Sequence, residues 1–297
     1  MLRITVIGAT GRTGRRVVAR LCAHGHAVTA LGLTAAKLAT LDPRADAHAL
    51  DVGATTALAP HVAAADVVVS CAHARYTGAL LAALPARDLR LVLMGSVRRY
   101  LAIPDRDGAE IAEGERQFMA SGRPGVMLHA SMIFGAPDDG NVSRVLDTLA
   151  QWPRALPIVL PLPDGGRRLV QPIFIDDVAA AVVAAVERSD SNGDPLVLAG
   201  PEPIAYRAMI EHCAAALGRR ARVLPVPLGL IATVAAIAAR AGIRLPLNAA
   251  ELRRAGEDKR FDVAPMIARL GVRPIGFAEG LARMNRPSAA GAKPREC

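Results

Sequence analysis

Three glycines at intervals of three residues follow a short apolar run near the start of the chain. The run spans Leu2–Ile7, the glycines fall at positions 8, 11 and 14, and helical spacing of apolar residues continues to His24. In a strand–turn–helix unit of this kind, the first glycine permits a sharp turn and the second lets backbone N–H groups approach a phosphate. The third lets helix and strand pack closely, and the helix N-terminus adds partial positive charge. The spacing predicts a turn that binds the pyrophosphate of a dinucleotide through Gly8, Thr10, Gly11, Arg12, Thr13 and Gly14.

Apolar runs alternate with amphipathic stretches through the first half of the chain. Helices are expected over Gly14–His24, Tyr76–Leu84 and Gly108–Ser121. Strands that alternate with helices need crossover connections, so they form a parallel, doubly wound sheet. Right-handed crossovers leave few topologies, and the strand order 3-2-1-4-5-6 is expected. The six predicted strands are Leu2–Ile7, Ala27–Leu31, Ala47–Leu50, Ala65–Ser70, Leu89–Met94 and Val126–His129.

The sequence divides into a first domain and a smaller second lobe. Residues 1–135 are expected to form a Rossmann dinucleotide-binding domain of the α/β class. Residues 136–286 are expected to form a mainly helical C-terminal substrate lobe, from which residues 171–200 return to the sheet. The tail 287–297 is rich in Ala, Gly, Pro and Lys and is expected to be disordered.

The charge balance is strongly basic, with a net charge of +9 over 297 residues. Such a chain attracts anions, including dinucleotide phosphates, acidic substrates and anionic lipids. The arginines are spread along the chain and no helix-turn-helix, finger or RNA-binding signature accompanies them, which disfavours nucleic acid as a partner. Leu228–Ala239 is too short to span a bilayer, so burial in the core is expected, with peripheral membrane contact as the alternative.

Cysteines and the N-terminus bear on the compartment. The first residues enter a strand directly, which leaves no room for a signal peptide and favours a cytoplasmic location. The cysteines show no C-x-x-C spacing, so neither a disulfide framework nor a zinc site follows from them, and no histidine or carboxylate spacing predicts a metal site. The four cysteines are Cys22, Cys71, Cys213 and Cys297.

The G-x-x-G-x-x-G motif at residues 8–14 resembles that of the atypical and extended short-chain dehydrogenase/reductases, including epimerase-like members. Further segments resemble this superfamily across about residues 2–284, among them Leu91–Ser96 and Gly166–Val178. The resemblance implies that Asp51 and Val52 contact adenine, and that Ser96 belongs to the catalytic site. It also implies an NAD(P)-dependent oxidoreductase or epimerase-like enzyme with a small-molecule substrate.

The cofactor is expected to be NADP, with NAD as the alternative. NAD-preferring members place an acid at the end of the second strand, but Leu31-Gly32-Leu33-Thr34 contains none. NADP-preferring relatives often place arginine where Gly32 stands, so that contact is missing too. Arg12 and Lys37 remain as candidates for the 2′-phosphate, with solvated surface charges as the alternative interpretation of both.

The catalytic pair usual in the superfamily is missing. Reduction normally uses a tyrosine whose pKa is lowered by a lysine four residues later. The residues four after Tyr76, Tyr100 and Tyr206 are Leu, Pro and Ile, so the chain has no Tyr-x-x-x-Lys. In the atypical branch, the motif before the sixth strand resembles Lys-x-x-x-Glu. Here the segment Ile111–Glu115 keeps the glutamate but has isoleucine in place of the lysine.

Other polar residues follow the predicted fourth and fifth strands. Ser96 and Tyr100 are candidate catalytic residues, because two neighbouring guanidinium groups can lower the pKa of a tyrosine. His73 is a candidate general acid, whereas His129 lies among apolar neighbours and is expected to be a core histidine. Arginines around a crevice favour an anionic, small or nucleotide-linked substrate. The candidate substrate residues are Arg98, Arg99, Asn141, Arg144 and Arg167.

Two functions are compatible with these features. The first is an NADP-dependent oxidoreductase or epimerase-like enzyme, which Ser96 and the following Arg-Arg-Tyr segment favour. The second is a non-catalytic NADP(H)-binding protein that senses redox state or stabilises a complex. The missing Tyr-x-x-x-Lys pair favours the second, and fold alone does not establish chemistry.

Overall fold

The computed structural model describes residues 1–102, 105–188, 190, 192–227, 229–230 and 257–284. Its internal contacts divide the chain into two units. Unit 1 comprises Met1–Ile133, Ile173–Pro201 and Phe261–Pro274, and unit 2 comprises Phe134–Pro172, Glu202–Arg260 and Ile275–Cys297. The short strands β7 (Ile133–Phe134) and β10 (Ile173–Phe174) lie where the chain first leaves unit 1 and re-enters it.

Unit 1 is built on a seven-stranded sheet in the order β11-β6-β5-β4-β1-β2-β3. Each of its neighbouring strand pairs is parallel. This confirms the doubly wound fold and the order predicted for the first six strands, and adds β11 beside β6. The strands are β1 (Arg3–Ile7), β2 (Ala27–Gly32), β3 (Asp46–Ala49), β4 (Val67–Ser70), β5 (Arg90–Ser96), β6 (Gly125–Ala130) and β11 (Leu196–Leu198).

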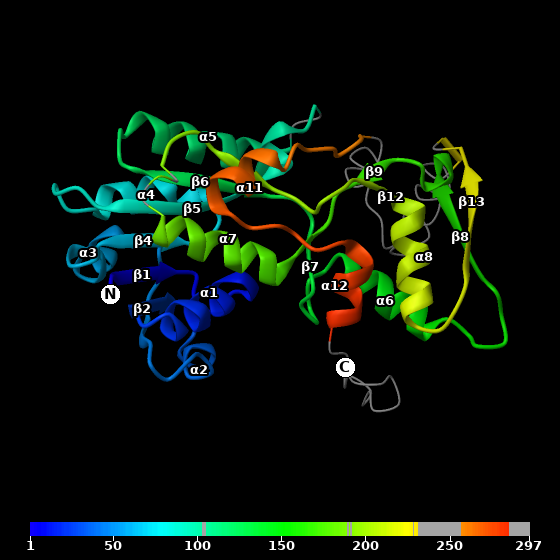
Figure 1. Ribbon diagram of the computed structural model, residues 1–297, viewed down its shortest axis with the longest axis horizontal. Helices are drawn as coiled ribbons and strands as arrows, with labels where there is room; N and C mark the ends of the chain where they lie inside the picture. Colours follow the sequence, from blue (N-terminus) through cyan, green and yellow to red (C-terminus); the bar gives the residue numbers. More distant parts are fainter. Residues whose placement is uncertain (103–104, 189, 191, 228, 231–256, 285–297) are drawn as a thin grey trace, which may run out of the picture. The chain divides into compact units, whose positions relative to one another are not determined.

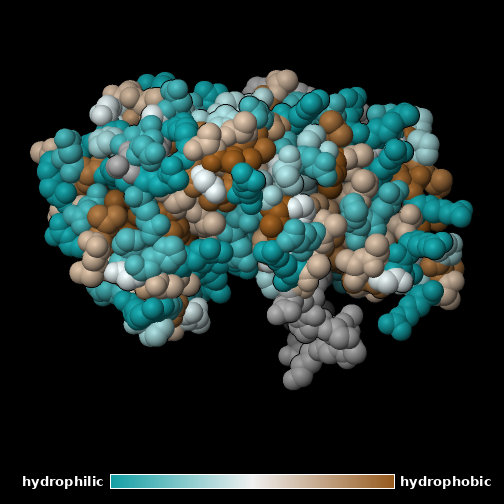
Figure 2. Space-filling model, in the orientation of Figure 1, coloured by the Kyte–Doolittle hydropathy of each residue, from teal (hydrophilic) through white to brown (hydrophobic). Residues whose placement is uncertain are grey.

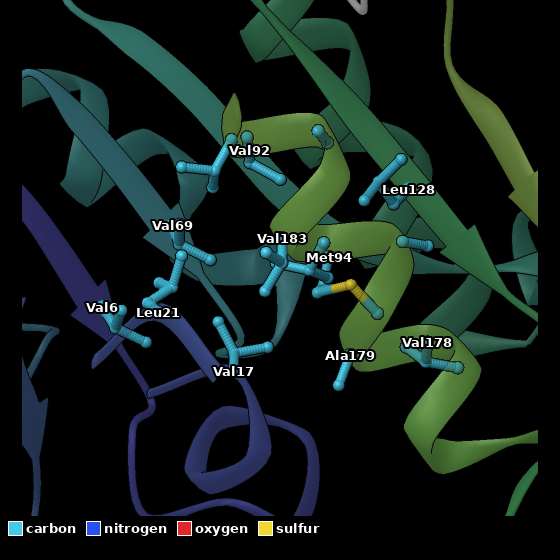
Figure 3. Packing of buried hydrophobic residues seen from close by; sticks show 14 of the residues in the cluster. Val6, Val17, Leu21, Val69, Val92, Met94, Leu128, Val178, Ala179 and Val183 are labelled. Atoms are coloured by element: carbon cyan, nitrogen blue, oxygen red, sulfur yellow. The ribbon is translucent and has the colours of Figure 1, made fainter. Parts of the chain in front are cut away.

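Helices α1 (Arg12–Ala23) and α7 (Ile175–Glu187) cover one face of the sheet (Figure 1). Side chains alternate along each strand, so every second residue points to this face. Figure 3 shows Val17 and Leu21 of α1 and Val183 of α7 against strand residues. The helices pack on these strand residues because both layers are apolar and fully or nearly buried. The strand residues labelled in Figure 3 are Val6, Val69, Val92, Met94 and Leu128.

Helices α3 (Thr55–Ala63), α4 (Thr77–Ala83) and α5 (Arg106–Ala120) cover the opposite face. Leu58, Leu80 and Phe118 from these helices pack with the alternate residues of the strands, including Leu91 and Leu93. The sequence analysis predicted α4 and α5 but not α3. Helix α3 contains Pro60 and buries only two apolar side chains, so its sequence carries little helical periodicity.

Helix α11 (Ala264–Leu270) completes unit 1, although its residues were predicted to belong to the C-terminal lobe. Met266 and Leu270 join the buried cluster formed by α1 and α7. Arg269 donates to the carbonyl oxygens of Asn192 and Asp194, next to β11. The extent of unit 1 therefore differs from the predicted first domain, because these apolar residues pack in its core although they are distant from it in sequence.

Unit 2 contains helices and short strand pairs. Strand β8 (Ile158–Pro163) pairs in parallel with β13 (Ala221–Val226), and β9 (Leu169–Val170) pairs antiparallel with β12 (Ile204–Ala205). Arg219 donates to the carbonyl oxygens of Leu149 and Trp152, and so ties the end of α8 to that of α6. Among the described residues of unit 2, the helices are α6 (Val142–Gln151), α8 (Tyr206–Ala216) and α12 (Phe277–Arg283).

The predicted apolar segment Leu228–Ala239 lies almost entirely outside the described residues, as does the tail 287–297. Among the residues that the structure describes, no helix combines the length and apolar character needed to cross a membrane. Hydrophilic side chains cover much of the surface in Figure 2, with apolar residues in patches between them.

Candidate functional site

The glycine turn between β1 and α1 is shaped by close backbone contacts. Gly8 has a φ of 73°, and a Cβ atom there would lie 2.9 Å from the backbone nitrogen of Ala72. A Cβ atom on Gly14 would lie 2.2 Å from the carbonyl oxygen of Gly8. Neither position accepts a side chain, so the chain turns sharply after β1 and α1 starts directly against it.

The N-terminus of α1 is left open by its own sequence. Gly11 is the N-cap, with no side-chain cap, and the first turn carries no acidic residue. The first N–H groups of a helix lack partners within the helix and attract anions. Gly11 and Arg12 are exposed beside them. This arrangement fits the predicted dinucleotide pyrophosphate.

The end of β2 lies against the same turn. A Cβ atom on Gly32 would lie 2.8 Å from Cγ2 of Thr10, so Thr10 excludes a side chain at this position. The arginine that NADP-preferring relatives carry there therefore cannot fit without moving Thr10. Lys37 on α2 (Ala35–Leu38) is exposed, and it stays a predicted contact of the 2′-phosphate.

Asp51 follows β3 and shapes a turn of its own. Its Oδ1 accepts a hydrogen bond of 2.9 Å from the Gly53 N–H. Val52 is half-buried against the cluster below α3 and α4. Asp51 is exposed, so its carboxylate is accessible, and the predicted adenine contact stays a prediction.

Helix α5 supports the turns that follow β4 and β5. These turns are the 3-10 helices η1 (Ala74–Tyr76) and η2 (Val97–Tyr100). A Cβ atom on Gly108 would lie 2.8 Å from the Arg98 oxygen, and one on Gly114 would lie 2.4 Å from the Ala74 oxygen. Two glycines on one helix thus bring it into direct contact with both turns.

Acidic residues of α5 and its N-cap pair with the arginines of these turns. Arg98 forms ion pairs with Asp105 and Asp107, and Arg99 Nε lies 2.5 Å from Glu115 Oε2. Arg98 and Arg99 were predicted to bind an anionic substrate. In the structure their charges pair with carboxylates of the chain itself, which leaves less positive charge for a ligand, and their substrate contact stays a prediction.

Tyr100 differs from its predicted state. Its pKa is raised, because burial disfavours the phenolate and Glu115 adds negative charge, which together outweigh Arg99. The expectation that two guanidinium groups lower this pKa is therefore wrong. Arg98 is engaged by aspartates, and Arg99 lies over the ring, with its guanidinium carbon 5.0 Å from the ring centroid. Tyr100 is 44% exposed and keeps its proton at neutral pH.

Ser96 and His73 lie at the carboxyl ends of their strands as predicted. Ser96 ends β5, and its Oγ accepts a hydrogen bond of 3.3 Å from the Arg98 N–H. His73 caps η1 by accepting a hydrogen bond of 3.2 Å from the Arg75 N–H at Nδ1. Both side chains are half-buried, and their hydrogen bonds leave the Ser96 hydroxyl proton and His73 Nε2 available to a ligand.

His73, Asp107 and Glu110 offer ligand atoms within 4.8 Å of one another. Such a cluster can hold a cation in principle. Here, however, Asp107 pairs with Arg98, and Glu110 Oε1 lies 2.8 Å from Arg106 Nε. Two of the three groups therefore already have ion-pair partners, and the cluster by itself does not assign a metal site.

Glu115 and His129 form a link that their positions in the sequence do not reveal. His129 is fully buried on β6, as expected of a core histidine, but its Nε2 lies 2.7 Å from Glu115 Oε2. The retained glutamate of the Ile111–Glu115 segment was the available signal. Its partner was not visible, because β6 meets α5 only in the folded chain.

The remaining predicted substrate residues belong to unit 2. Asn141 and Arg144 are exposed at the start of α6, where the buried Asp139 accepts hydrogen bonds from the Asn141 and Ser143 N–H groups. Arg167 lies 2.7 Å from Asp164, so its charge is also paired. The role of these residues in substrate binding stays a prediction.

Comparison with known proteins finds a family match in the first part of the chain. Residues 8–108 match a family described as NAD(P)H-binding. A 3-diazoavenalumate denitrifying reductase from a Streptomyces species is 29% identical over 272 residues, covering 76% of this chain and 86% of the relative. An uncharacterised protein of Mycobacterium tuberculosis is 29% identical over 227 residues, which cover 73% of this chain. The chain spans only 23% of the length of that relative.

The fold also matches solved structures over nearly its full length. The UDP-glucose 4-epimerase of Thermotoga maritima, solved with UDP-glucose, aligns with a TM-score of 0.72 at 13% identity. The alignment covers 95% of this chain and 97% of the epimerase chain. At this identity the likeness concerns the fold.

Proposed function

We propose that this chain, an NAD(P)-binding protein of the extended short-chain dehydrogenase/reductase type, is a reductase that transfers hydride from a nicotinamide cofactor to a small substrate. One relative of this chain is named as a reductase, and proteins of similar fold include UDP-glucose 4-epimerases, which supports an enzymatic role in general. The observation that carries the proposal is the group of polar side chains that follow β4 and β5. Ser96, Tyr100 and His73 lie there at least partly accessible, at the strand ends where ligands of open α/β sheets bind.

The cofactor supplies the hydride when it is bound. The open N-terminus of α1 and the glycine turn are suited to hold its pyrophosphate. The Ser96 hydroxyl can donate a hydrogen bond to a substrate oxygen or nitrogen, because in its hydrogen bond with the Arg98 N–H its oxygen is the acceptor. His73 Nε2 can bind a second polar group of the substrate.

The protonated state of Tyr100 is compatible with a role as a hydrogen-bond donor to the substrate of a reduction. A raised pKa keeps its hydroxyl protonated at neutral pH, so it can donate a hydrogen bond but is a poor base. Oxidation of an alcohol needs a base that removes the hydroxyl proton, and this chain lacks the Tyr-x-x-x-Lys pair that provides one. The Streptomyces relative is likewise named as a reductase.

The test begins with cofactor binding and proceeds to turnover. NADPH and NADH are titrated calorimetrically, and the purified protein is then assayed for NAD(P)H oxidation with aldehydes, ketones, nucleotide-linked sugars and aryl diazo compounds. Controls without protein are needed because diazo compounds react with NAD(P)H directly. Transfer of deuterium from the C4 position of labelled NADPH to a product supports the proposal. Binding without transfer to any of these substrates contradicts it.

A second candidate is a non-catalytic NADP(H)-binding protein. The pairing of Arg98 and Arg99 with carboxylates favours it, since these residues then stabilise the fold and are not free for a substrate. This alternative requires tight dinucleotide binding with no turnover. The same labelling experiment therefore separates the two candidates.

A further inference from the structure

Glu115 places a carboxylate inside unit 1, between a helix, a strand and a turn. Its Oε2 lies 2.5 Å from Arg99 Nε of η2 and 2.7 Å from His129 Nε2 of β6. Glu115 is 8% exposed and His129 is fully buried. A buried carboxylate is costly unless it is paired and hydrogen-bonded, so its two partners are held to it closely.

The sequence makes room for this arrangement at Gly95. Gly95 on β5 is in register with His129 on β6, and a Cβ atom at Gly95 would lie 2.4 Å from His129 Nδ1. The imidazole therefore occupies the space that a side chain would need. Gly95 directly precedes Ser96, so the ring lies beside the end of the strand that carries this serine.

The other side of the imidazole meets Tyr100. The two rings pack edge to face, with centroids 5.3 Å apart, and the Arg99 guanidinium lies over the Tyr100 ring. Glu115 is therefore linked to Tyr100 indirectly, through His129 and through Arg99. Its pairing with Arg99 fixes one end of η2, and its hydrogen bond with His129 fixes the ring against which Tyr100 rests.

We propose that Glu115, acting through His129 and Arg99, is a positioning residue that holds η2, with Ser96 and Tyr100 at its ends, in the geometry the reaction requires. The inference rests on the proposed function for its link to catalysis. Replacement of a buried ion pair by apolar residues is often neutral or stabilising. The value of this pair therefore lies in fixing an arrangement more than in adding stability.

The protonation of His129 gives the proposal a specific signature. The charged and titratable groups that act on its ring are Glu115 from α5 and Arg99 and Tyr100 from η2. The side-chain-free Gly95 and the backbone of Ser96 lie beside the ring on β5. Burial lowers the pKa of His129, and Glu115 partly opposes this by raising it. Removal of the carboxylate charge must therefore lower the pKa of His129 further. Any activity limit set by His129 protonation then moves to lower pH.

The test compares Glu115→Gln with Glu113→Gln. Glu113 lies on the same helix but is exposed and pairs only with Arg116 and Gln117, so it is a matched control. Glu115→Gln is expected to lower kcat by about 10- to 100-fold with the NAD(P)H Kd nearly unchanged, and to move the acid limb of the pH profile to lower pH. Combination with Tyr100→Phe should cost less than the product of the single losses, because both changes affect one turn.

An unchanged kcat and pH profile in a folded Glu115→Gln protein would overturn the proposal. If that variant does not fold, Arg99→Lys replaces it, since lysine keeps the charge but loses the fixed Nε geometry. Independently of turnover, the Tyr100 and His129 ring signals are followed by NMR. Shifts in Glu115→Gln that are absent in Glu113→Gln support the positioning role even if no substrate is found, and unchanged signals contradict it.

Discussion

At the residue scale, single glycines decide what the turn after β1 can accept. Gly8 and Gly14 are blocked by backbone atoms, whereas Gly11 has a φ of −68° and ψ of 166°, which any residue adopts. A Cβ atom at Gly11 would lie 3.2 Å from the Gly8 oxygen, a contact that a small shift relieves. At Gly11 the fold therefore tolerates a side chain, whereas a phosphate bound at this turn would clash with it.

The first prediction concerns Gly11→Val. The variant should fold, because its backbone is unstrained, and should lose dinucleotide binding by about 100-fold or more, equivalent to about 3 kcal/mol. Calorimetric titration with NADPH and far-UV circular dichroism measure the two properties. Gly276→Val is the matched control, since Gly276 is also a helix N-cap with φ −68° and ψ 157° and has open space around its Cβ position. Retained binding in Gly11→Val would place the phosphate elsewhere.

The second prediction concerns the choice between cofactors. NADPH should bind more tightly than NADH, because the end of β2 offers no acid to the ribose and Arg12 and Lys37 lie exposed near it. Arg12→Ala should remove most of the difference, since one charge-assisted phosphate contact is worth about 1.5–3 kcal/mol. Calorimetry with both cofactors on both proteins tests this. Equal affinities in the unmodified protein would contradict it.

Individual site residues were predictable only where local sequence determines them. The glycine turn follows from its spacing, whereas the ion pairs of Arg98 and Arg99 depend on acids of α5 and its N-cap. The raised pKa of Tyr100 depends on Glu115 in the same way. Nothing in the spacing of these residues shows that the helix turns its acids toward the two loops.

At the scale of elements, α5 organises the candidate site. Two of its glycines allow close contact with the backbone of η1 and η2. Acids of the helix and its N-cap pair with the arginines of the same two turns. A helix normally gains stability when alanine replaces an internal glycine, by about 1 kcal/mol. At Gly114 the neighbour is a backbone carbonyl, which cannot move away as a flexible side chain can.

The third prediction is that Gly114→Ala destabilises the protein by about 1–3 kcal/mol, despite the better helix propensity of alanine. The added Cβ would approach the Ala74 oxygen to 2.4 Å and push α5 away from η1. Urea unfolding measures the change. The reverse substitution at an exposed position of the same helix, Ala109→Gly, measures how much the difference in helix propensity between alanine and glycine contributes. A stabilised Gly114→Ala would show that the helix–turn contact is loose.

Elements were predictable where apolar periodicity was strong. Five of the six predicted strands and the helices α1, α4 and α5 carry it, whereas β3 has only a weak pattern, and the structure contains each of them. Helix α3 was missed because of its weak pattern, and α2 spans only four residues. Strands β8 and β13 contain three prolines between them, which argue against strands in a local sequence window.

At the scale of the whole molecule, unit 1 draws on three separate stretches of the chain. A ligand that binds the folded protein and not the unfolded chain stabilises it in proportion to its concentration. The fourth prediction is therefore that NADPH at about 100 times its Kd stabilises the protein by about 2.7 kcal/mol, which raises Tm by several degrees. Differential scanning fluorimetry measures the shift, and Gly11→Val should show none. A shift retained in that variant would point to a second dinucleotide site.

The non-contiguous build of unit 1 affects how the protein forms on the ribosome. Strands β1 to β6 emerge first, but the face that includes Val92, Met94 and Leu128 stays without α7 until residue 187 has been made. At roughly 5–20 residues per second, this leaves an apolar sheet face uncovered for a few seconds in the nascent chain. A chaperone that binds exposed apolar strands has its opportunity in that interval. The same reasoning makes a fragment that ends at Ile133 a poor substitute for the whole protein, because its sheet lacks α7, one of the two helices that cover this face, and its last strand, β11.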